Sequence, residues 1–239
     1  MGYRYKEIYF PGRDMYIIRK GFAARGGKAC GRSSNRSETS EQQKKVNLKN
    51  AQDRHLFDIL NNFFEKTFDR NGKVVHGDRW ITLTYAHQPS SFEAAHKNLT
   101  AYLKKIKRKF KDCKYKAKTE ETESGFVHHH LLISRDVPHD VLADLWSFSN
   151  HIDDKEIYSL EDLKLCFYFI KNDGSHKCVR SKFTSSRNLE KPLIRVKTVL
   201  ASSWKREPVP KRGYDIHDVQ IYFDYFGFEA QEYILKRRC

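Results

Sequence analysis

The chain of 239 residues lacks the patterns that mark a disulfide framework, a zinc ribbon or a membrane span. Its five cysteines are odd in number and widely spaced, and they include no C-x-x-C pair, which favours reduced thiols. No apolar run approaches the roughly 20 residues that a membrane-spanning helix needs. The first residues also lack the apolar segment of a signal peptide. These absences favour a soluble, cytoplasmic protein without a membrane partner.

Negative charge is also scarce, because 30 Asp and Glu stand against 45 Lys and Arg, for a formal net charge of +15. Such a surplus is typical of proteins that bind a polyanion, and nucleic acid is favoured because no helix shows a broad lipid-seeking face. General basicity without a specific partner is the alternative. The 13 Tyr, 16 Phe and three Trp could stack on bases, although most of them must lie in a core.

The chain is predicted to contain two parts, a basic hairpin and flexible arm over residues 1–39 and one α+β domain over 40–239. Apolar periodicity and turn residues predict helices starting near Ser40 and over 92–111, 138–146 and 160–171. Strands are predicted over 6–10, 15–19, 80–85, 115–121, 126–133 and 219–223. Two stretches are ambiguous: 147–158 is compatible with a short strand, and 194–204 with a strand or a short helix.

The most informative stretch runs from Gly125 to Ile133 and contains three consecutive histidines. In a strand, alternation places His128 and His130 on one face and His129 on the other. Two imidazoles at this spacing can converge on one divalent metal ion, whereas a chance cluster on a surface strand is the alternative reading. A turn before this strand predicts an antiparallel hairpin with 115–121. Glu120 or Glu121 would then lie beside His128, and alternation allows only one of them to face it.

A second informative element is the helix predicted over 160–171. Its apolar seam has a neighbouring flank on which Lys164, Tyr168 and Lys171 follow each other at i, i+4 and i+7. Positive potential beside a tyrosine favours the phenolate, and therefore a nucleophile. An amphipathic helix with lysines at its rim is the structural alternative. Two imidazoles, a carboxylate and a tyrosine together could cleave a phosphodiester, with the metal ion as a Lewis acid.

This set of motifs resembles the HUH endonuclease superfamily, and within it the single-tyrosine rolling-circle replication initiators of plasmids, phages and integrative elements. The resemblance rests on His128–His130 and on Tyr168–Lys171, which match a His–hydrophobic–His motif and a Tyr-x-x-Lys motif. Residues 81–85 look like the strand motif that precedes them. Residues 46–51, 186–192 and the tyrosine-rich C-terminus also look like such initiators.

The resemblance implies a five-stranded antiparallel sheet with packed helices and a site for Mg²⁺ or Mn²⁺ on His128 and His130. The third ligand would be Glu120, five residues before Gly125, with Glu121 as the alternative. The resemblance further implies that Tyr168 attacks single-stranded origin DNA, forms a 5′-phosphotyrosine and frees a 3′-OH. Lys171 would orient the tyrosine or offset charge on the phosphate. The DNA would carry a hairpin or inverted repeat, and a separate helicase would unwind it.

Two features depart from the family pattern. His129 stands where an aliphatic residue is usual, which leaves open a metal pair that includes His129. Asn172 occupies the position four residues after Tyr168, so a second tyrosine on that helix is absent. A relaxase or single-tyrosine transposase would share the same chemistry, and a non-catalytic nucleic-acid-binding protein is the rival of another class. The basic residues assigned to DNA contacts are Lys104, Lys105, Lys107, Arg108, Lys164 and Arg187.

Overall fold

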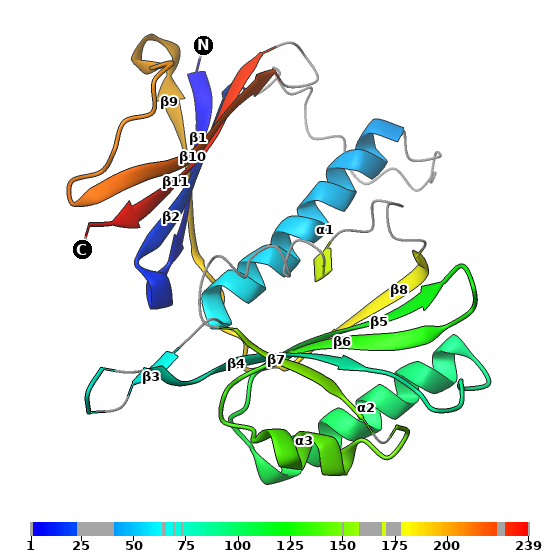
Figure 1. Ribbon diagram of the computed structural model, residues 1–239. Helices are drawn as coiled ribbons and strands as arrows, with labels where there is room; N and C mark the ends of the chain where they lie inside the picture. Colours follow the sequence, from blue (N-terminus) through cyan, green and yellow to red (C-terminus); the bar gives the residue numbers. More distant parts are fainter. Residues whose placement is uncertain are drawn as a thin grey trace. The chain divides into compact units, whose positions relative to one another are not determined.

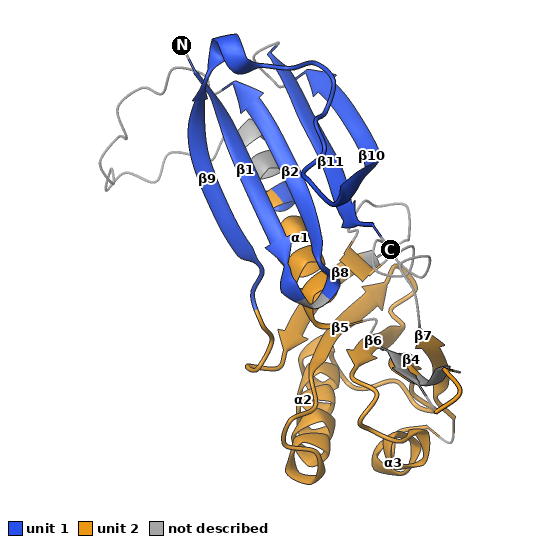
Figure 2. Ribbon diagram, turned by 90° about the vertical axis from the view of Figure 1, so that its left-hand side faces the viewer, with its two compact units in different colours: residues 1–49, 191–239 blue, residues 50–190 orange. Residues whose placement is uncertain are grey.

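The chain folds into two compact units, seen in a computed structural model (Figure 1). One unit comprises residues 1–49 and 191–239, and the other comprises residues 50–190 (Figure 2). This division does not coincide with the boundary predicted after residue 39. The structure describes residues 2–22, 41–63, 66–68, 70–72, 74–149, 151–157, 169–170, 178–223 and 228–238.

The first unit contains a five-stranded antiparallel sheet in the order β10-β11-β2-β1-β9. Its strands are β1 (Gly2–Phe10), β2 (Met15–Phe22), β9 (Leu193–Leu200), β10 (Tyr214–Phe223) and β11 (Glu229–Arg237). The predicted hairpin is confirmed, with the 3-10 turn η1 (Pro11–Arg13) between β1 and β2. The ambiguous stretch after residue 193 forms strand β9 and then the short 3-10 helix η3 (Ala201–Ser203).

The second unit is built on a larger sheet in the order β3-β4-β6-β5-β8, and β7 also pairs with β4. Its strands are β3 (Lys66–Phe68), β4 (Val74–Leu83), β5 (Tyr115–Thr122), β6 (Val127–Ile133), β7 (Asp153–Ile157) and β8 (Cys178–Ser185). All of these pairings are antiparallel. The path β7-β4-β6-β5-β8 is a five-stranded antiparallel sheet, as the family resemblance implied, and the α+β class is confirmed.

In the part of the chain that the structure describes, three α-helices accompany these strands: α1 (Glu41–Asn62), α2 (Phe92–Lys109) and α3 (His139–Leu145). They match the predicted helices near 40, over 92–111 and over 138–146. The predicted helix over 160–171 lies outside the described residues, apart from Phe169 and Ile170. No described helix is long and apolar enough to cross a membrane.

The two faces of the second sheet support different cores. On one face, Leu131 and Ile133 pack with the buried stripe of α2 and with Trp146. On the other face, Trp80 and Leu132 pack with residues of α1 and with Phe169 and Ile170. Because side chains alternate along a strand, neighbouring residues of β6 belong to different cores. Each face of the central strands therefore has its own chemistry.

Residues 186–190, part of the segment that resembled replication initiators, tie the second unit together. The Ser186 hydroxyl accepts a hydrogen bond from the backbone N–H of Tyr115 at 3.1 Å. The Asn188 amide donates to the carbonyl oxygen of Asp112 at 2.9 Å, just after α2. Asn62 at the end of α1 exchanges two hydrogen bonds with the backbone of Glu190, at 2.8 and 2.9 Å. This segment therefore joins the ends of two helices to the start of β5.

The sequence did not predict β8, and it indicated β7 only weakly. β7 reads Asp-Asp-Lys-Glu-Ile, and its charged residues hide the alternation of a strand. β8 lies at the edge of the sheet, where Val179 is exposed and Phe183 is only partly buried. An edge strand needs no buried stripe on both faces, so its sequence carries little periodic signal.

Candidate metal centre

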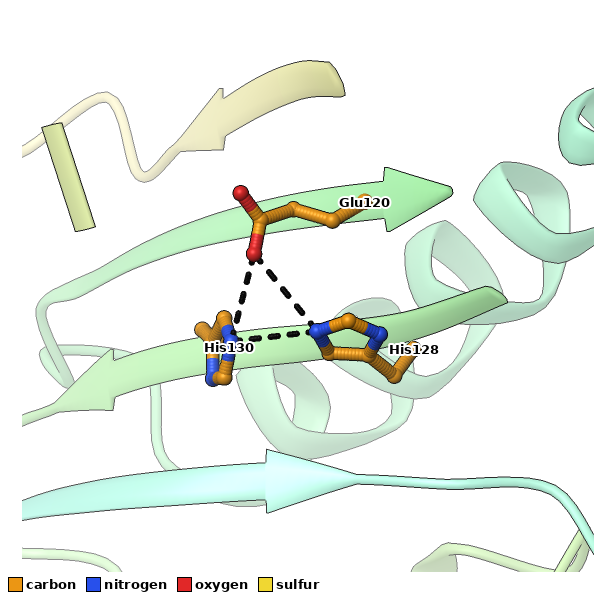
Figure 3. Close-up of side chains that lie close together, drawn as sticks. All are labelled: Glu120, His128 and His130. Carbon is orange, nitrogen blue, oxygen red and sulfur yellow. Dashed lines mark hydrogen bonds and ion pairs between the residues drawn. The ribbon is translucent and has the colours of Figure 1, made fainter. Parts of the chain in front are cut away.

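Three side chains that the sequence selected converge on one point of the sheet, as Figure 3 shows. Glu120 projects from β5, and His128 and His130 project from β6, where Glu120 is the direct cross-strand partner of His128. Glu120 Oε2 lies 3.5 Å from His128 Nε2 and 3.3 Å from His130 Nε2. The two imidazole nitrogens are 3.2 Å apart. The hairpin therefore brings together three atoms that could bind a metal ion.

The spacing of these donor atoms fits a divalent ion. The point equidistant from the three atoms lies about 1.9 Å from each, close to the 2.0–2.2 Å of metal bonds to imidazole or carboxylate. These three residues would therefore hold a divalent ion at ordinary bond lengths. Three protein ligands on one side leave coordination positions open for water or substrate. The cluster could thus hold a metal ion, and its donor set alone admits several divalent metals.

A buried lysine balances the charge of the glutamate. Lys118 is fully buried and forms an ion pair with Glu120 Oε1, the oxygen that does not face the histidines. Burial alone would raise the pKa of Glu120, but hydrogen bonds from the two imidazoles and from Lys118 outweigh it and hold this pKa well below its usual range. Glu120 is therefore a carboxylate with one oxygen committed to Lys118 and the other directed at the metal position.

His130 is held in place by two neighbours on β4. Its Nδ1 lies 3.4 Å from the Thr82 hydroxyl, and its ring packs against Trp80 with a centroid distance of 5.4 Å. A partner on Nδ1 fixes the ring orientation and leaves Nε2 to bind a metal. Burial lowers the pKa of His130, which favours the neutral imidazole that can act as a ligand. Sequence analysis assigned no role to Thr82, Trp80 or Lys118, although the alternation of 80–85 and 115–121 could have placed them on this face.

His129 lies on the opposite face of the sheet and has its own partners. Its Nε2 is 2.7 Å from the Tyr85 hydroxyl, and its Nδ1 is 3.0 Å from the Thr119 hydroxyl. Burial, with smaller contributions from neighbouring histidines, lowers the pKa of His129 to about 3. Both ring nitrogens of His129 are thus occupied in a buried network that is separate from the candidate metal centre.

Glu121, the alternative third ligand, also lies away from the cluster. Its carboxylate accepts a hydrogen bond from Arg180 Nε at 3.2 Å, and Arg180 binds Glu93 on α2 as well. Glu121 therefore takes part in an exposed ion pair on the side of α2. Of the two candidates, the structure brings only Glu120 to the histidines.

The predicted nucleophile segment is described only in part. Tyr168, Lys171 and Lys164 lie outside the described residues. Phe169, which follows Tyr168 in the chain, is buried and packs edge-on against Trp80 at a centroid distance of 5.4 Å. Trp80 also contacts His130, so a short chain of ring contacts leads from Phe169 to the candidate metal centre.

The basic residues of α2 do not face the cluster. Lys104, Lys105 and Arg108 are exposed on a helix whose buried stripe packs on the His129 face. Lys107 donates hydrogen bonds to the carbonyl oxygens of Lys111 and Cys113, at 2.6 and 2.9 Å, and so ties the turn that follows α2 to the helix. Arg187 is exposed on the segment after β8. The sheet therefore separates the lysines of α2 from the candidate metal centre.

The comparison with known protein families bears on this site. Residues 78–192 match the family model described as replication-associated protein ORF2/G2P. The matched residues include the candidate metal centre, Thr82, Lys118 and Tyr168. The match supports a role for this chain in the initiation of DNA replication. Such a role suggests nuclease or strand-transferase activity and DNA binding. Neither a curated protein nor a solved structure matched the chain.

Proposed function

We propose that this protein initiates rolling-circle replication, by nicking and rejoining single-stranded origin DNA as an HUH-type endonuclease. The convergence of Glu120, His128 and His130 within a segment that matches replication-associated proteins carries this proposal. These three residues would hold Mg²⁺ or Mn²⁺. When bound, the ion supplies Lewis-acid polarisation of the scissile phosphate.

Tyr168 is the proposed nucleophile. Its hydroxyl oxygen forms a bond to phosphorus while the bond from phosphorus to the 3′ oxygen breaks; the tyrosine proton goes to solvent, and the leaving 3′ oxygen takes a proton from solvent. The products are a 5′-phosphotyrosine and a free 3′-OH that can prime synthesis. Attack of a 3′-OH on the phosphotyrosine reverses these bond changes and rejoins the strand without a nucleotide cofactor. Lys171 would stabilise the phenolate or the phosphate.

The protein groups prepare this chemistry in distinct ways. Lys118 keeps one oxygen of Glu120 occupied, so the other oxygen is the one that would hold the ion. Thr82 and Trp80 fix the ring of His130. Within the proposed nucleophile segment, the described residue Phe169 packs against Trp80, the same tryptophan that contacts His130.

A covalent-adduct assay tests the proposal. The purified protein is incubated with single-stranded DNA of its own origin and Mn²⁺ or Mg²⁺, and the products are separated on a denaturing gel. We expect a protein–DNA adduct that disappears with a chelator. No adduct of the wild-type protein under these conditions would refute the enzymatic function and favour a non-catalytic nucleic-acid-binding protein.

The Tyr168→Phe variant identifies the nucleophile. It should form no adduct, because it lacks the attacking oxygen, while it still binds Mn²⁺ and DNA. An adduct that persists in this variant would assign the nucleophile to another residue. An origin DNA with an inverted repeat, a separate helicase and a cytoplasmic location stay predictions from the sequence.

A further inference from the structure

An exposed aromatic side chain lies next to the candidate metal centre. Phe126 is 59% exposed and sits two residues before His128, at the turn between β5 and β6. Burying a phenylalanine side chain stabilises a protein by about 1.5–3 kcal/mol, and this position forgoes most of that gain. A single exposed apolar residue is common on protein surfaces, so its position and its backbone decide whether it has a role.

The strand register places Phe126 on the face of the metal ligands. Glu120 is the cross-strand partner of His128, and the backbone N–H of Thr122 donates to the carbonyl oxygen of Phe126 at 2.9 Å, which continues the same register by two residues on each strand. Side chains two residues apart in a strand share a face and are spaced by about 6.5–7 Å. The ring of Phe126 is therefore next in line beyond His128 on that face.

The backbone of this turn is held by several hydrogen bonds. The N–H of Phe126 donates to the Thr122 hydroxyl at 3.1 Å, and the N–H of Gly125 donates to the Thr122 carbonyl oxygen at 2.9 Å. Gly125 has a φ of +77°, a conformation that glycine adopts without strain. Outside the turn, the N–H of Val127 donates to the side chain of Gln88 at 2.8 Å. The backbone that carries the exposed ring of Phe126 is therefore held in place by hydrogen bonds.

We propose that Phe126 is a stacking platform for a nucleobase of single-stranded DNA, next to the phosphate that binds at the metal centre. This inference rests on the proposed function. Aromatic rings stack on any base, so the contact would position the strand and contribute no sequence specificity. A base on Phe126 would fix the strand about one nucleotide away from the phosphate that His128 helps to bind. Phe126 is thus a positioning residue for the substrate strand.

A binding experiment without metal separates this inference from the nicking reaction. The probe is fluorescein-labelled oligothymidine, measured by anisotropy in EDTA with the full chain. Phe126→Ala should weaken binding by roughly 5- to 150-fold, as expected for the loss of one base–aromatic stack. Phe126→Trp should bind within about twofold of the wild type, because it keeps a stacking surface. Phe223→Ala, which removes another exposed phenylalanine in the other unit, serves as the matched control and should not change the affinity.

Two further readouts identify stacking as the cause. The slope of log Kd against log salt concentration should be the same in Phe126→Ala and in the wild type, since no phosphate contact is lost. In Phe126→Trp, the tryptophan emission should be quenched more strongly on binding of oligothymidine than in the wild type, which has three native tryptophans. Both results distinguish a stacked base from an electrostatic or folding effect.

Several outcomes would overturn the inference. They are an unchanged affinity of Phe126→Ala, an equal loss in Phe126→Ala and Phe126→Trp, or an equal loss in Phe223→Ala. The proposed nicking function would survive each of these, provided that the wild type forms its adduct on origin DNA. If the wild type does not bind oligothymidine, this result refutes both the stacking role of Phe126 and the general binding of single-stranded DNA.

Discussion

Replacing Lys118 with methionine tests whether a buried ion pair organises the candidate metal centre. Lys118 is fully buried, and the side chain of Glu120 is only 10% exposed. Lys118→Met keeps a long unbranched side chain and removes the charge, so Glu120 remains buried without its cation. Breaking a buried ion pair in this way costs about 3–5 kcal/mol. Because the two imidazoles also hydrogen-bond to Glu120, we expect a loss near the lower end, about 3 kcal/mol.

Urea unfolding followed by tryptophan fluorescence measures this loss. A Trp204→Phe background leaves Trp80 and Trp146, which both belong to the unit of residues 50–190. The experiment is done in EDTA, so that no metal ion compensates the glutamate. A loss of about 3 kcal/mol would be a large part of the 5–15 kcal/mol that typically stabilises a folded domain.

Two additions identify the glutamate as the source of the loss. Lys118→Met combined with Glu120→Gln removes both charges, and it should recover most of the lost free energy of unfolding. Mn²⁺ at 100 times its Kd should stabilise Lys118→Met by about 2.7 kcal/mol, because the ion binds the folded state. A Lys118→Met variant as stable as the wild type, or a double variant no more stable than Lys118→Met, would refute the stabilising role of this ion pair.

Three further predictions concern the histidines. His130→Ala should weaken Mn²⁺ binding at least tenfold in calorimetry, whereas His129→Gln should lower stability and keep the metal affinity; equal weakening in both would contradict the assigned faces. Thr82→Val, which removes the oxygen next to His130 Nδ1, should weaken Mn²⁺ binding by about 10- to 100-fold, and an unchanged affinity would show that Thr82 does not orient the ring. Burial, together with Lys116, lowers the pKa of His55 to about 4. The unfolded chain therefore binds a proton near pH 6.5 that the folded chain does not, and stability falls as the pH drops from 6.5 to 4. For this partly exposed ring we expect about 1–2 kcal/mol, measured as the difference between the wild type and His55→Gln at pH 7 and 4.5; parallel curves would exclude His55 as the cause.

The paired histidines could be read from the sequence because their arrangement is local. A strand has a side-chain period of two, so residues 128 and 130 share a face wherever that strand packs. The turn at Gly125 joins this strand to the one before it, and a short hairpin leaves little freedom in the register. Glu120 was selected over Glu121 by family resemblance, and the register explains why it faces His128.

The environment of these ligands depended on the tertiary structure. Sequence patterns treat lysine as a surface residue, yet Lys116 and Lys118 are both buried on the face of β5 that bears Glu120. Their burial is possible because Asp58 on α1 and Glu120 supply the opposite charges, and α1 precedes β5 by more than one element. Pairings of this kind depend on which elements pack together, and local periodicity does not encode that.

The sheet of the first unit also depends on pairings between distant elements, which local sequence patterns do not encode. The N-terminal hairpin was predicted from its alternation and its turn, but its neighbours in the sheet are β9 and β11, which lie near the other end of the chain. The residues of a strand indicate that it pairs with another strand, and they do not specify which strand that is. The sequence by itself therefore determined the N-terminal hairpin, the hairpin of the paired histidines and the charge of this protein. The tertiary structure decided which distant strands complete each sheet and which charges become buried beside the metal ligands, because both follow from contacts between residues far apart in the chain.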